Sequence, residues 1–260
     1  MRALVVRSPH DVALETVPEP VCGEHDVLVA PLLAGVCGTD LELIDGSIDP
    51  AYVRYPLVLG HEWVGQLLGD VPGVASRGER VAVEGIIACG ECAECRIGAT
   101  NRCVTYDEIG FTRPGAIADR IAVPARQVHR IAASVNVDDA VLIEPMAVVW
   151  RALTRFPLRD GLDVVIVGDG TIALLAAHLV RRFNPARVVV AGRRAAQASL
   201  AGSAGADEFV TDVPSGRFDL VIEAAGTGPS ASTALKLAGR GAMVIMLGLP
   251  PHGTVVELAP

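Results

Sequence analysis

The chain has 260 residues, of which 51% are hydrophobic and 20% are charged. This size and composition exclude a disordered chain and favour a globular protein of two modest domains. The formal net charge of -8 provides no basic surface for nucleic acid or for an anionic membrane, so we expect a small-molecule partner.

Short strands separated by proline and glycine are predicted in the first part of the chain, over residues 2–7, 11–17 and 26–34. Residues 116–123 and 127–131 are predicted to add strands that close the same β-rich, barrel-like domain. The apolar start of the chain is too short for a secretory signal, and no uncharged apolar run is long enough to span a membrane. These features predict a cytoplasmic protein.

Two short segments supply the residue types of a catalytic metal site. Cys37 offers a thiolate, and the pair His61-Glu62 offers an imidazole and a carboxylate. Zinc accepts this mixture when one position must stay open for a substrate. Glu144 is a further carboxylate in an apolar helix predicted from Asn136 or Asp138 towards Leu153. An unpaired carboxylate would be costly there, so we expect a metal or a strong partner unless Glu144 lies on the exposed face of the helix.

Neighbouring residues have both a structural and a chemical interpretation. Thr39 is expected either to cap a short helix or to relay a proton, and the two roles are compatible. Asp40 is expected to orient a metal-bound histidine, or only to favour the first turn of that helix. Gly60 and Gly65, on either side of the His-Glu pair, predict a backbone packed too closely for side chains.

Four of the six cysteines are crowded into one loop, at positions 89, 92, 95 and 103. The absence of a signal segment argues against a disulfide framework. Four thiolates at this spacing can close a tetrahedron around one ion, which is typical of a structural zinc site. Chance, an iron–sulfur cluster or free buried thiols are the alternatives.

In the second half, residues 164–167 form an apolar strand that runs into a glycine turn and then a helix. Gly168 permits the tight turn and Gly170 allows the backbone to approach a pyrophosphate, which would rest on the helix start at Thr171 and Ile172. Further strands are predicted at 187–192, 218–223 and 242–247. Gly226 and Gly248, which follow the last two, are expected to form turns on the cofactor side.

The strand predicted at 187–192 ends in Gly192-Arg193-Arg194, where a site that prefers NAD would place an acid. Two guanidinium groups suit the 2′-phosphate of NADP. We therefore predict NADP(H) in preference to NAD(H). The alternative is that the two arginines only begin a solvated helix.

Together, the Cys37-Gly-Thr-Asp segment, Gly60-His-Glu-x-x-Gly65, the four-cysteine lobe and Ile143-Glu144-Pro145 resemble the zinc-dependent medium-chain alcohol dehydrogenases. The resemblance is greatest to the threonine, sorbitol and glucose dehydrogenase-like branch. It implies an α/β protein with a GroES-like catalytic domain over residues 1–156. A Rossmann dinucleotide-binding domain would follow over residues 157–260.

The resemblance further implies that Cys37, His61 and Glu144 bind the catalytic zinc, with Glu62 behind the metal and Thr39 passing the alcohol proton outward. Several relatives carry histidine where this chain has Glu42, which leaves the outer end of the relay open. Relatives also continue beyond the last predicted strand. The C-terminal end is therefore expected to be shortened, and a homo-oligomer is expected if the missing strand is replaced.

The predicted activity is hydride transfer between a nicotinamide cofactor and an alcohol or carbonyl substrate, assisted by zinc. Asp40 and Glu42 favour a polyol, sugar or amino alcohol. Two alternatives are a catalytically inactive cofactor-binding or interaction protein of the same family and a redox sensor based on the cysteine lobe.

Overall fold

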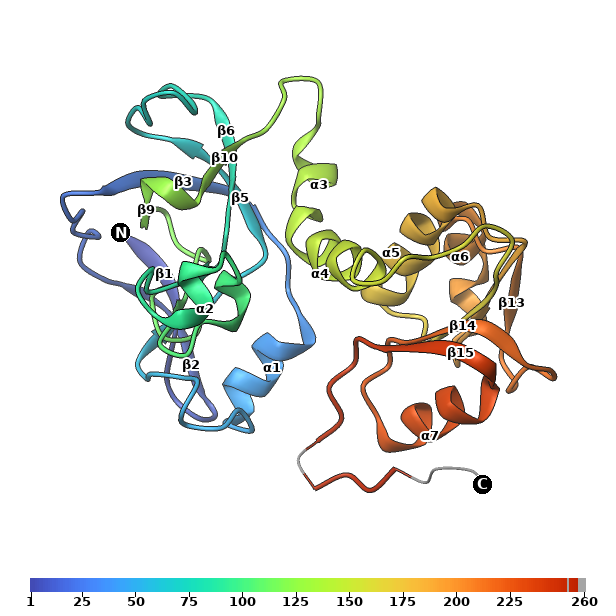
Figure 1. The fold of residues 1–260 in the computed structure, drawn as a ribbon. Coiled ribbons are helices and arrows are strands. Elements are labelled where there is room, and N and C mark those ends of the chain that lie inside the picture. Colours follow the sequence, from blue (N-terminus) through green and yellow to red (C-terminus); the bar gives the residue numbers. More distant parts are fainter. Residues whose placement is uncertain (252, 257–260) are drawn as a thin grey trace. The chain divides into compact units, whose positions relative to one another are not determined.

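The computed structural model describes residues 1–251 and 253–256 (Figure 1). Contacts divide the chain into two compact units, Met1–Glu144 and Pro145–Pro260. The division falls inside helix α4 (Ile143–Leu153), whereas the sequence predicted a boundary at the end of that helix, near residue 156. Within the described ranges, no helix has the length and apolar character needed to cross a bilayer.

The first unit is built from antiparallel sheets, in the orders β2-β1-β4, β10-β6-β5-β3-β9 and β7-β8. Its strands are β1 (Arg2–Ser8), β2 (Asp11–Thr16), β3 (Asp26–Ala34), β4 (Leu57–Val58), β5 (Trp63–Leu67), β6 (Arg80–Val83), β7 (Ile86–Ile87), β8 (Asp107–Glu108), β9 (Ile121–Pro124) and β10 (Val128–Arg130). Its helices are α1 (Gly38–Asp45), α2 (Ala93–Arg96), α3 (Val137–Ala140) and the 3₁₀ helices η1 (Thr100–Arg102) and η2 (Ala125–Gln127). The β-rich first domain expected from the sequence is therefore present.

Two predicted elements differ from the structure. The strand expected over 116–123 begins only at Ile121, because the backbone N–H groups of Ala116 and Ile117 are used by the loop 59–60. The single helix expected towards Leu153 is two helices, α3 and α4, and only the second contains Glu144. Pro145 accounts for the break. It has no backbone N–H to donate to the carbonyl of Val141, and in a continuous helix its ring would clash with that carbonyl.

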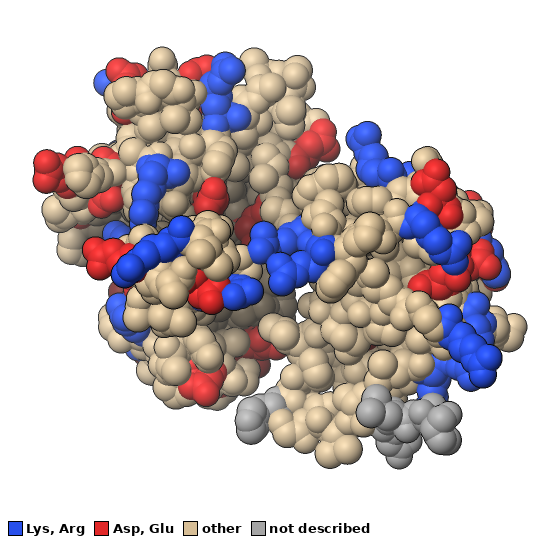
Figure 2. Space-filling model, viewed as in Figure 1, with Lys and Arg blue, Asp and Glu red and all other residues tan. Residues whose placement is uncertain are grey.

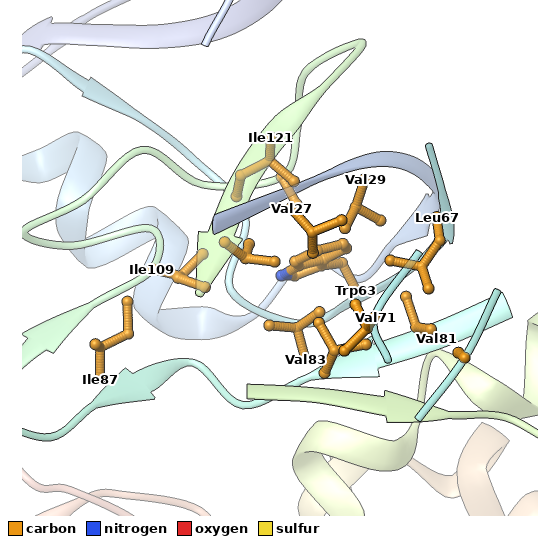
Figure 3. Close-up of a cluster of buried hydrophobic side chains, with 14 residues drawn as sticks. Val27, Val29, Trp63, Leu67, Val71, Val81, Val83, Ile87, Ile109 and Ile121 are labelled. Carbon is orange, nitrogen blue, oxygen red and sulfur yellow. The ribbon is translucent and has the colours of Figure 1, made fainter. Parts of the chain in front are cut away.

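The core of the five-stranded sheet surrounds the indole of Trp63 (Figure 3). Strands β3, β5 and β6 supply the apolar side chains around this ring, among them Val27, Val29, Leu67, Val81 and Val83. Alternate strand residues face this core, as expected when one face of a sheet is buried. The core fixes β5, and β5 begins directly after the His61-Glu62 pair.

Gly65 lies in β5 where no side chain fits. A Cβ at this position would stand 2.5 Å from Val29 Cγ1 and 2.8 Å from the carbonyl oxygen of Ala30. We expect Gly65→Ala to lower the free energy of unfolding by about 3 kcal/mol, since the core and the neighbouring strand must both shift. Chemical denaturation measures the effect. Gly85→Ala is the matched control, because a Cβ there meets nothing within 4 Å, and equal losses for the two variants would refute the packing argument.

The second unit contains a parallel sheet in the order β13-β12-β11-β14-β15. Its strands are β11 (Asp163–Val167), β12 (Arg187–Ala191), β13 (Glu208–Val210), β14 (Phe218–Glu223) and β15 (Ala238–Met246). Its helices, besides the greater part of α4, are α5 (Thr171–Val180), α6 (Ala198–Ala204), α7 (Gly228–Leu237) and the 3₁₀ helices η3 (Arg181–Phe183) and η4 (Ala195–Gln197). In Figure 1, α7 lies on one side of β14 and β15, and α5 and α6 lie on the other.

The central strands β11, β12 and β14 are rich in valine and isoleucine, as expected for strands covered on both faces. Two features were not expected from the sequence: the short strand β13, and the start of β15 at Ala238 instead of residue 242. The order of strands reverses between β11 and β14. In open α/β sheets, ligands bind at the carboxyl ends of the strands beside such a reversal.

Candidate metal and cofactor sites

Cys37 is held at the start of helix α1 as its N-cap residue. Its backbone N–H donates to Asp40 Oδ2 at 2.8 Å, so the acid in the first turn closes the helix start back on the cysteine. The expectation that Thr39 caps this helix is wrong, because Thr39 lies within the first turn. Its hydroxyl instead lies 3.8 Å from Cys37 Sγ, beside the candidate metal site.

The backbone at Gly60, the carboxylate of Asp40 and the ring of Phe111 together position His61. Gly60 before it has a φ of +104° and leaves no room for a side chain against Ile117, as the sequence predicted for a close backbone approach. Asp40 Oδ1 lies 3.2 Å from His61 Nδ1, and the ring of Phe111 lies 5.2 Å from the imidazole. One ring nitrogen therefore faces a carboxylate, which is the usual arrangement of a metal-binding histidine.

The electrostatics at His61 favour a positive charge. Burial lowers the pKa of His61, but the Asp40 carboxylate and the Cys37 sulfur outweigh it and raise this pKa to about 10. A buried imidazole this basic marks a place where the surrounding groups stabilise a cation. A divalent ion bound by the same atoms would take the place of that proton.

The possible ligand atoms of Cys37, His61 and Glu62 all lie within 4.8 Å of one another. We call these three residues the mixed-donor group. A thiolate, an imidazole and a carboxylate within this distance fit a zinc ion and leave one tetrahedral position open. The donor set therefore suits a catalytic rather than a structural zinc.

Glu144 lies close to the mixed-donor group but is not part of it. Burial and, after it, the carboxylate of Glu62 raise the pKa of Glu144 to about 7, and the charge of His61 opposes both. Glu108, which the sequence did not single out, also contributes to this field, and burial raises its pKa. With Asp40 and Glu62, four carboxyl groups therefore lie near His61. The assignment of Glu144 as a zinc ligand stays a prediction.

The four cysteines of the loop 89–103 converge as their spacing predicts, with every sulfur within 4.8 Å of the others. The Sγ atoms of Cys89 and Cys95 are 3.9 Å apart, and those of Cys92 and Cys103 are 4.0 Å apart. A tetrahedron with Zn–S bonds of about 2.3 Å has edges of about 3.8 Å. The lobe therefore fits one zinc ion with no open position.

Hydrogen bonds favour the thiolate at one cysteine of this lobe, whereas burial and the neighbouring thiols raise the pKa of Cys95 to about 12. The Thr105 hydroxyl and the backbone N–H groups of Glu91 and Cys92 lower the pKa of the Cys89 thiol to about 6. The thiolate is the form that binds a metal. All six cysteines lack disulfide bonds, and Cys22 stands exposed and outside both groups.

The cofactor motif lies at the carboxyl end of β11, at the reversal of strand order. Gly168 has a φ of +133°, and a Cβ there would stand 2.9 Å from the backbone of Ala224, so only glycine fits this turn. A Cβ on Gly170, the N-cap of α5, would meet nothing within 4 Å. No side chain caps α5, so the N–H groups of its first turn, at Thr171 and Ile172, are not used by a capping side chain. This cradle fits a pyrophosphate.

Arg193 and Arg194 follow β12 as predicted, but their surroundings differ. The guanidinium of Arg194 is paired with Asp169, whereas within residues 1–251 and 253–256 that of Arg193 has no hydrogen bond or ion pair. The two arginines are therefore not equivalent at this end of the sheet.

Gly226 and Gly248 close the carboxyl ends of β14 and β15 against each other. A Cβ on Gly248 would stand 2.2 Å from the nitrogen of Gly226 and 2.6 Å from Glu223 Oε2. Glu223, which sequence reasoning missed, is fully buried, and its Oε1 accepts the N–H groups of Ala225 and Gly226. The sequence signal that could have identified Glu223 is its position as an acid at the end of the apolar run Phe218–Glu223.

Comparison with known proteins shows which family the chain resembles. Residues 23–133 match the alcohol dehydrogenase GroES-like domain. The chain is 34% identical over 280 positions to L-threonine 3-dehydrogenase of Streptomyces coelicolor and 31% identical over 274 positions to that of Cronobacter sakazakii. These alignments cover 100% and 99% of the chain and 80% of each relative.

Solved structures that resemble this chain are also dehydrogenases. A protein from Sinorhizobium meliloti 1021, described as a zinc-binding dehydrogenase and bound to NADP, superposes with a TM-score of 0.92 at 29% identity, covering 100% of this chain and 80% of that one. Galactitol-1-phosphate dehydrogenase from Escherichia coli gives 0.87 at 27% identity, covering 100% and 78%. With its two zinc-type donor groups and its parallel dinucleotide-binding sheet, the chain belongs to the zinc-dependent medium-chain dehydrogenases, oxidoreductases that act on alcohols with a nicotinamide cofactor.

Proposed function

We propose that this chain oxidises a secondary hydroxyl of a small polyol, sugar or amino alcohol, reversibly, with NADP(H) preferred over NAD(H). The mixed-donor group of Cys37, His61 and Glu62 carries the proposal, because its ligand atoms converge within 4.8 Å and three donors leave one of the four tetrahedral positions of zinc open. Zinc bound there would lower the pKa of the hydroxyl, and the nicotinamide would accept the hydride.

The residues around the group have distinct tasks in this scheme. Asp40 holds the His61 ring by its Nδ1, which leaves the other nitrogen for the metal. The Thr39 hydroxyl, beside Cys37 Sγ, is in place to take the proton of the alcohol. In the arrangement described, Glu62 is the carboxylate that completes the donor set, and Glu144 is the predicted ligand that can replace it.

The acids near the group support a substrate with several hydroxyls or an amino group. Glu108 and Glu144 are half-buried carboxyls next to His61, and they can accept hydrogen bonds from hydroxyl or ammonium groups. The sequence favoured Asp40 and Glu42 for this purpose. Asp40 is instead used by Cys37 and His61, and Glu42 is exposed on α1. Threonine, the substrate in the names of the relatives above, is such an amino alcohol.

The preference for NADP rests on the arginines after β12. A 2′-phosphate at the carboxyl end of this strand would meet the unpaired guanidinium of Arg193. In Figure 2, basic and acidic side chains both appear on the face shown, and neither kind covers it. The net charge of -8 favours a small-molecule partner over nucleic acid or an anionic membrane, whereas a cytoplasmic location and a homo-oligomer stay expectations.

Turnover of a panel of polyols, sugars, aliphatic alcohols and threonine, with NADP and NAD and with zinc content measured on the same sample, tests the proposal. We expect oxidation of at least one polyhydroxylated or amino alcohol, faster with NADP, in protein that carries zinc. Dinucleotide binding without turnover of any of these substrates in zinc-loaded protein would favour an inactive cofactor-binding protein instead.

A matched pair of variants can distinguish the roles of Glu62 and Glu144 as zinc ligands. If Glu62 completes the donor set, we expect Glu62→Gln to lower the affinity of the catalytic zinc by more than the roughly 10–100-fold that loss of a residue supporting a ligand costs, with a smaller loss for Glu144→Gln. Competition with a chromogenic chelator measures both affinities. The opposite order would assign the ligand to Glu144, as the resemblance implied.

A further inference from the structure

Asp169 is the central residue of the Gly168-Asp169-Gly170 turn, yet its carboxylate is directed to the neighbouring strand end. Oδ2 accepts the backbone N–H groups of Arg193 and Arg194 at 2.9 and 2.8 Å. Oδ1 accepts Nε and Nη2 of Arg194 at 3.1 and 2.8 Å, and the Asp169 carbonyl accepts Nη2 at 3.0 Å. The phosphate-binding turn and the end of β12 are thus joined through one side chain.

The carboxylate fills the place of the missing side chain at position 192. A Cβ on Gly192 would stand 2.4 Å from Asp169 Cβ and 2.9 Å from Asp169 Oδ2. An acid at the end of this strand would bind the ribose 2′-hydroxyl in a site for NAD. Here an acid occupies the same space but comes from the glycine turn.

Asp169 is not free to bind a ribose. A carboxylate offers about four lone-pair positions, and the four N–H groups of Arg193 and Arg194 use them. The side chain is 13% exposed, so the pair is largely shielded from water on the side of the acid. The same contacts hold the guanidinium of Arg194 against the glycine turn and balance its charge.

We propose that Asp169 is a specificity-determining residue for the nucleotide: it withdraws Arg194 from the 2′-phosphate site and leaves Arg193 to recognise the phosphate. This inference rests on the proposed dinucleotide binding and deepens it. It assigns different roles to two adjacent arginines that the sequence treats as a pair.

The experiment compares the dissociation constants of NADP⁺ and NAD⁺ by isothermal titration calorimetry, with adenosine 2′,5′-bisphosphate and 5′-AMP as truncated probes. Asp169→Asn keeps an oxygen for the two backbone N–H groups but loses the charge that holds Arg194. We expect the ratio of affinities, NADP over NAD, to rise about tenfold in this variant, as one released charge-assisted contact to phosphate would give. Arg193→Gln should lower the ratio about tenfold, and Arg194→Gln should change it less than threefold.

Two further variants separate the release of Arg194 from a general change in charge. In Asp169→Asn with Arg194→Gln the ratio should return towards the wild-type value, whereas simple loss of repulsion between Asp169 and phosphate would keep it raised. Glu208→Gln removes another ion pair of the same sheet, that with Arg187, and should leave the ratio unchanged. Thermal denaturation of each variant checks that the fold is retained.

The outcomes distinguish this inference from the function on which it rests. Wild-type protein that binds neither dinucleotide would refute the proposed function. Wild-type protein that binds them, with an unchanged ratio in Asp169→Asn or with equal losses in Arg193→Gln and Arg194→Gln, would refute the role of Asp169 alone.

Discussion

Replacing Cys37 with serine is expected to leave one zinc ion per chain in place of two and to reduce alcohol oxidation on the order of a thousandfold or more. The thiolate is the softest ligand of the mixed-donor group, and a serine hydroxyl is a poor substitute for it. Serine is also a favoured N-cap, so α1 should keep its start and the protein its fold. Metal analysis and steady-state kinetics with NADP measure the two effects.

Cys22→Ser is the matched control for this prediction, since Cys22 is exposed and belongs to neither cysteine-containing metal group. It should retain both ions and the full rate. Activity of Cys37→Ser close to that of the control, with both ions still bound, would show that Cys37 does not bind the catalytic metal.

The second large effect is expected from Cys103→Ser, which removes the buried member of the four-cysteine lobe. The lobe has few apolar residues of its own, so its order depends on the ion. We expect the loss of one zinc, a fall in Tm of roughly 5–10 °C, and rapid tryptic cleavage at Arg96 and Arg102 within the lobe. Limited proteolysis followed by mass spectrometry locates the cleavage.

The catalytic zinc should remain in Cys103→Ser when the protein is purified with zinc present, because the mixed-donor group uses none of the lobe cysteines. Cys22→Ser again serves as the control for loss of a thiol. If Cys103→Ser kept both ions and resisted trypsin like the control, the lobe would not be a structural zinc site.

Much of the architecture could be predicted from local patterns. The strands β1, β2 and β3 and the strand, glycine turn and helix from β11 to α5 follow from alternation, apolar runs and turn residues within a few positions of one another. The cysteine spacing predicted its own cluster for the same reason. These features depend on neighbours in the sequence, which a single sequence displays.

What the sequence could not give depends on distant contacts. Glu108 gains its place beside His61 from the pairing of β7 with β8, and Asp169 reaches Arg194 only because β11 and β12 lie side by side. The start of α1 at Cys37 instead of Thr39 also reflects Asp40, which accepts the Cys37 N–H with one oxygen while the other faces the His61 ring, distant in the sequence. Neither periodicity nor spacing encodes such a shared contact.

The two donor groups are expected to differ in their affinity for zinc. The lobe offers four sulfur ligands and the mixed-donor group only one, so scarce zinc should fill the lobe first. When zinc is limiting, chains with a filled lobe and an empty mixed-donor group would be folded but inactive. Restoring the supply would then switch on an existing pool without new protein synthesis.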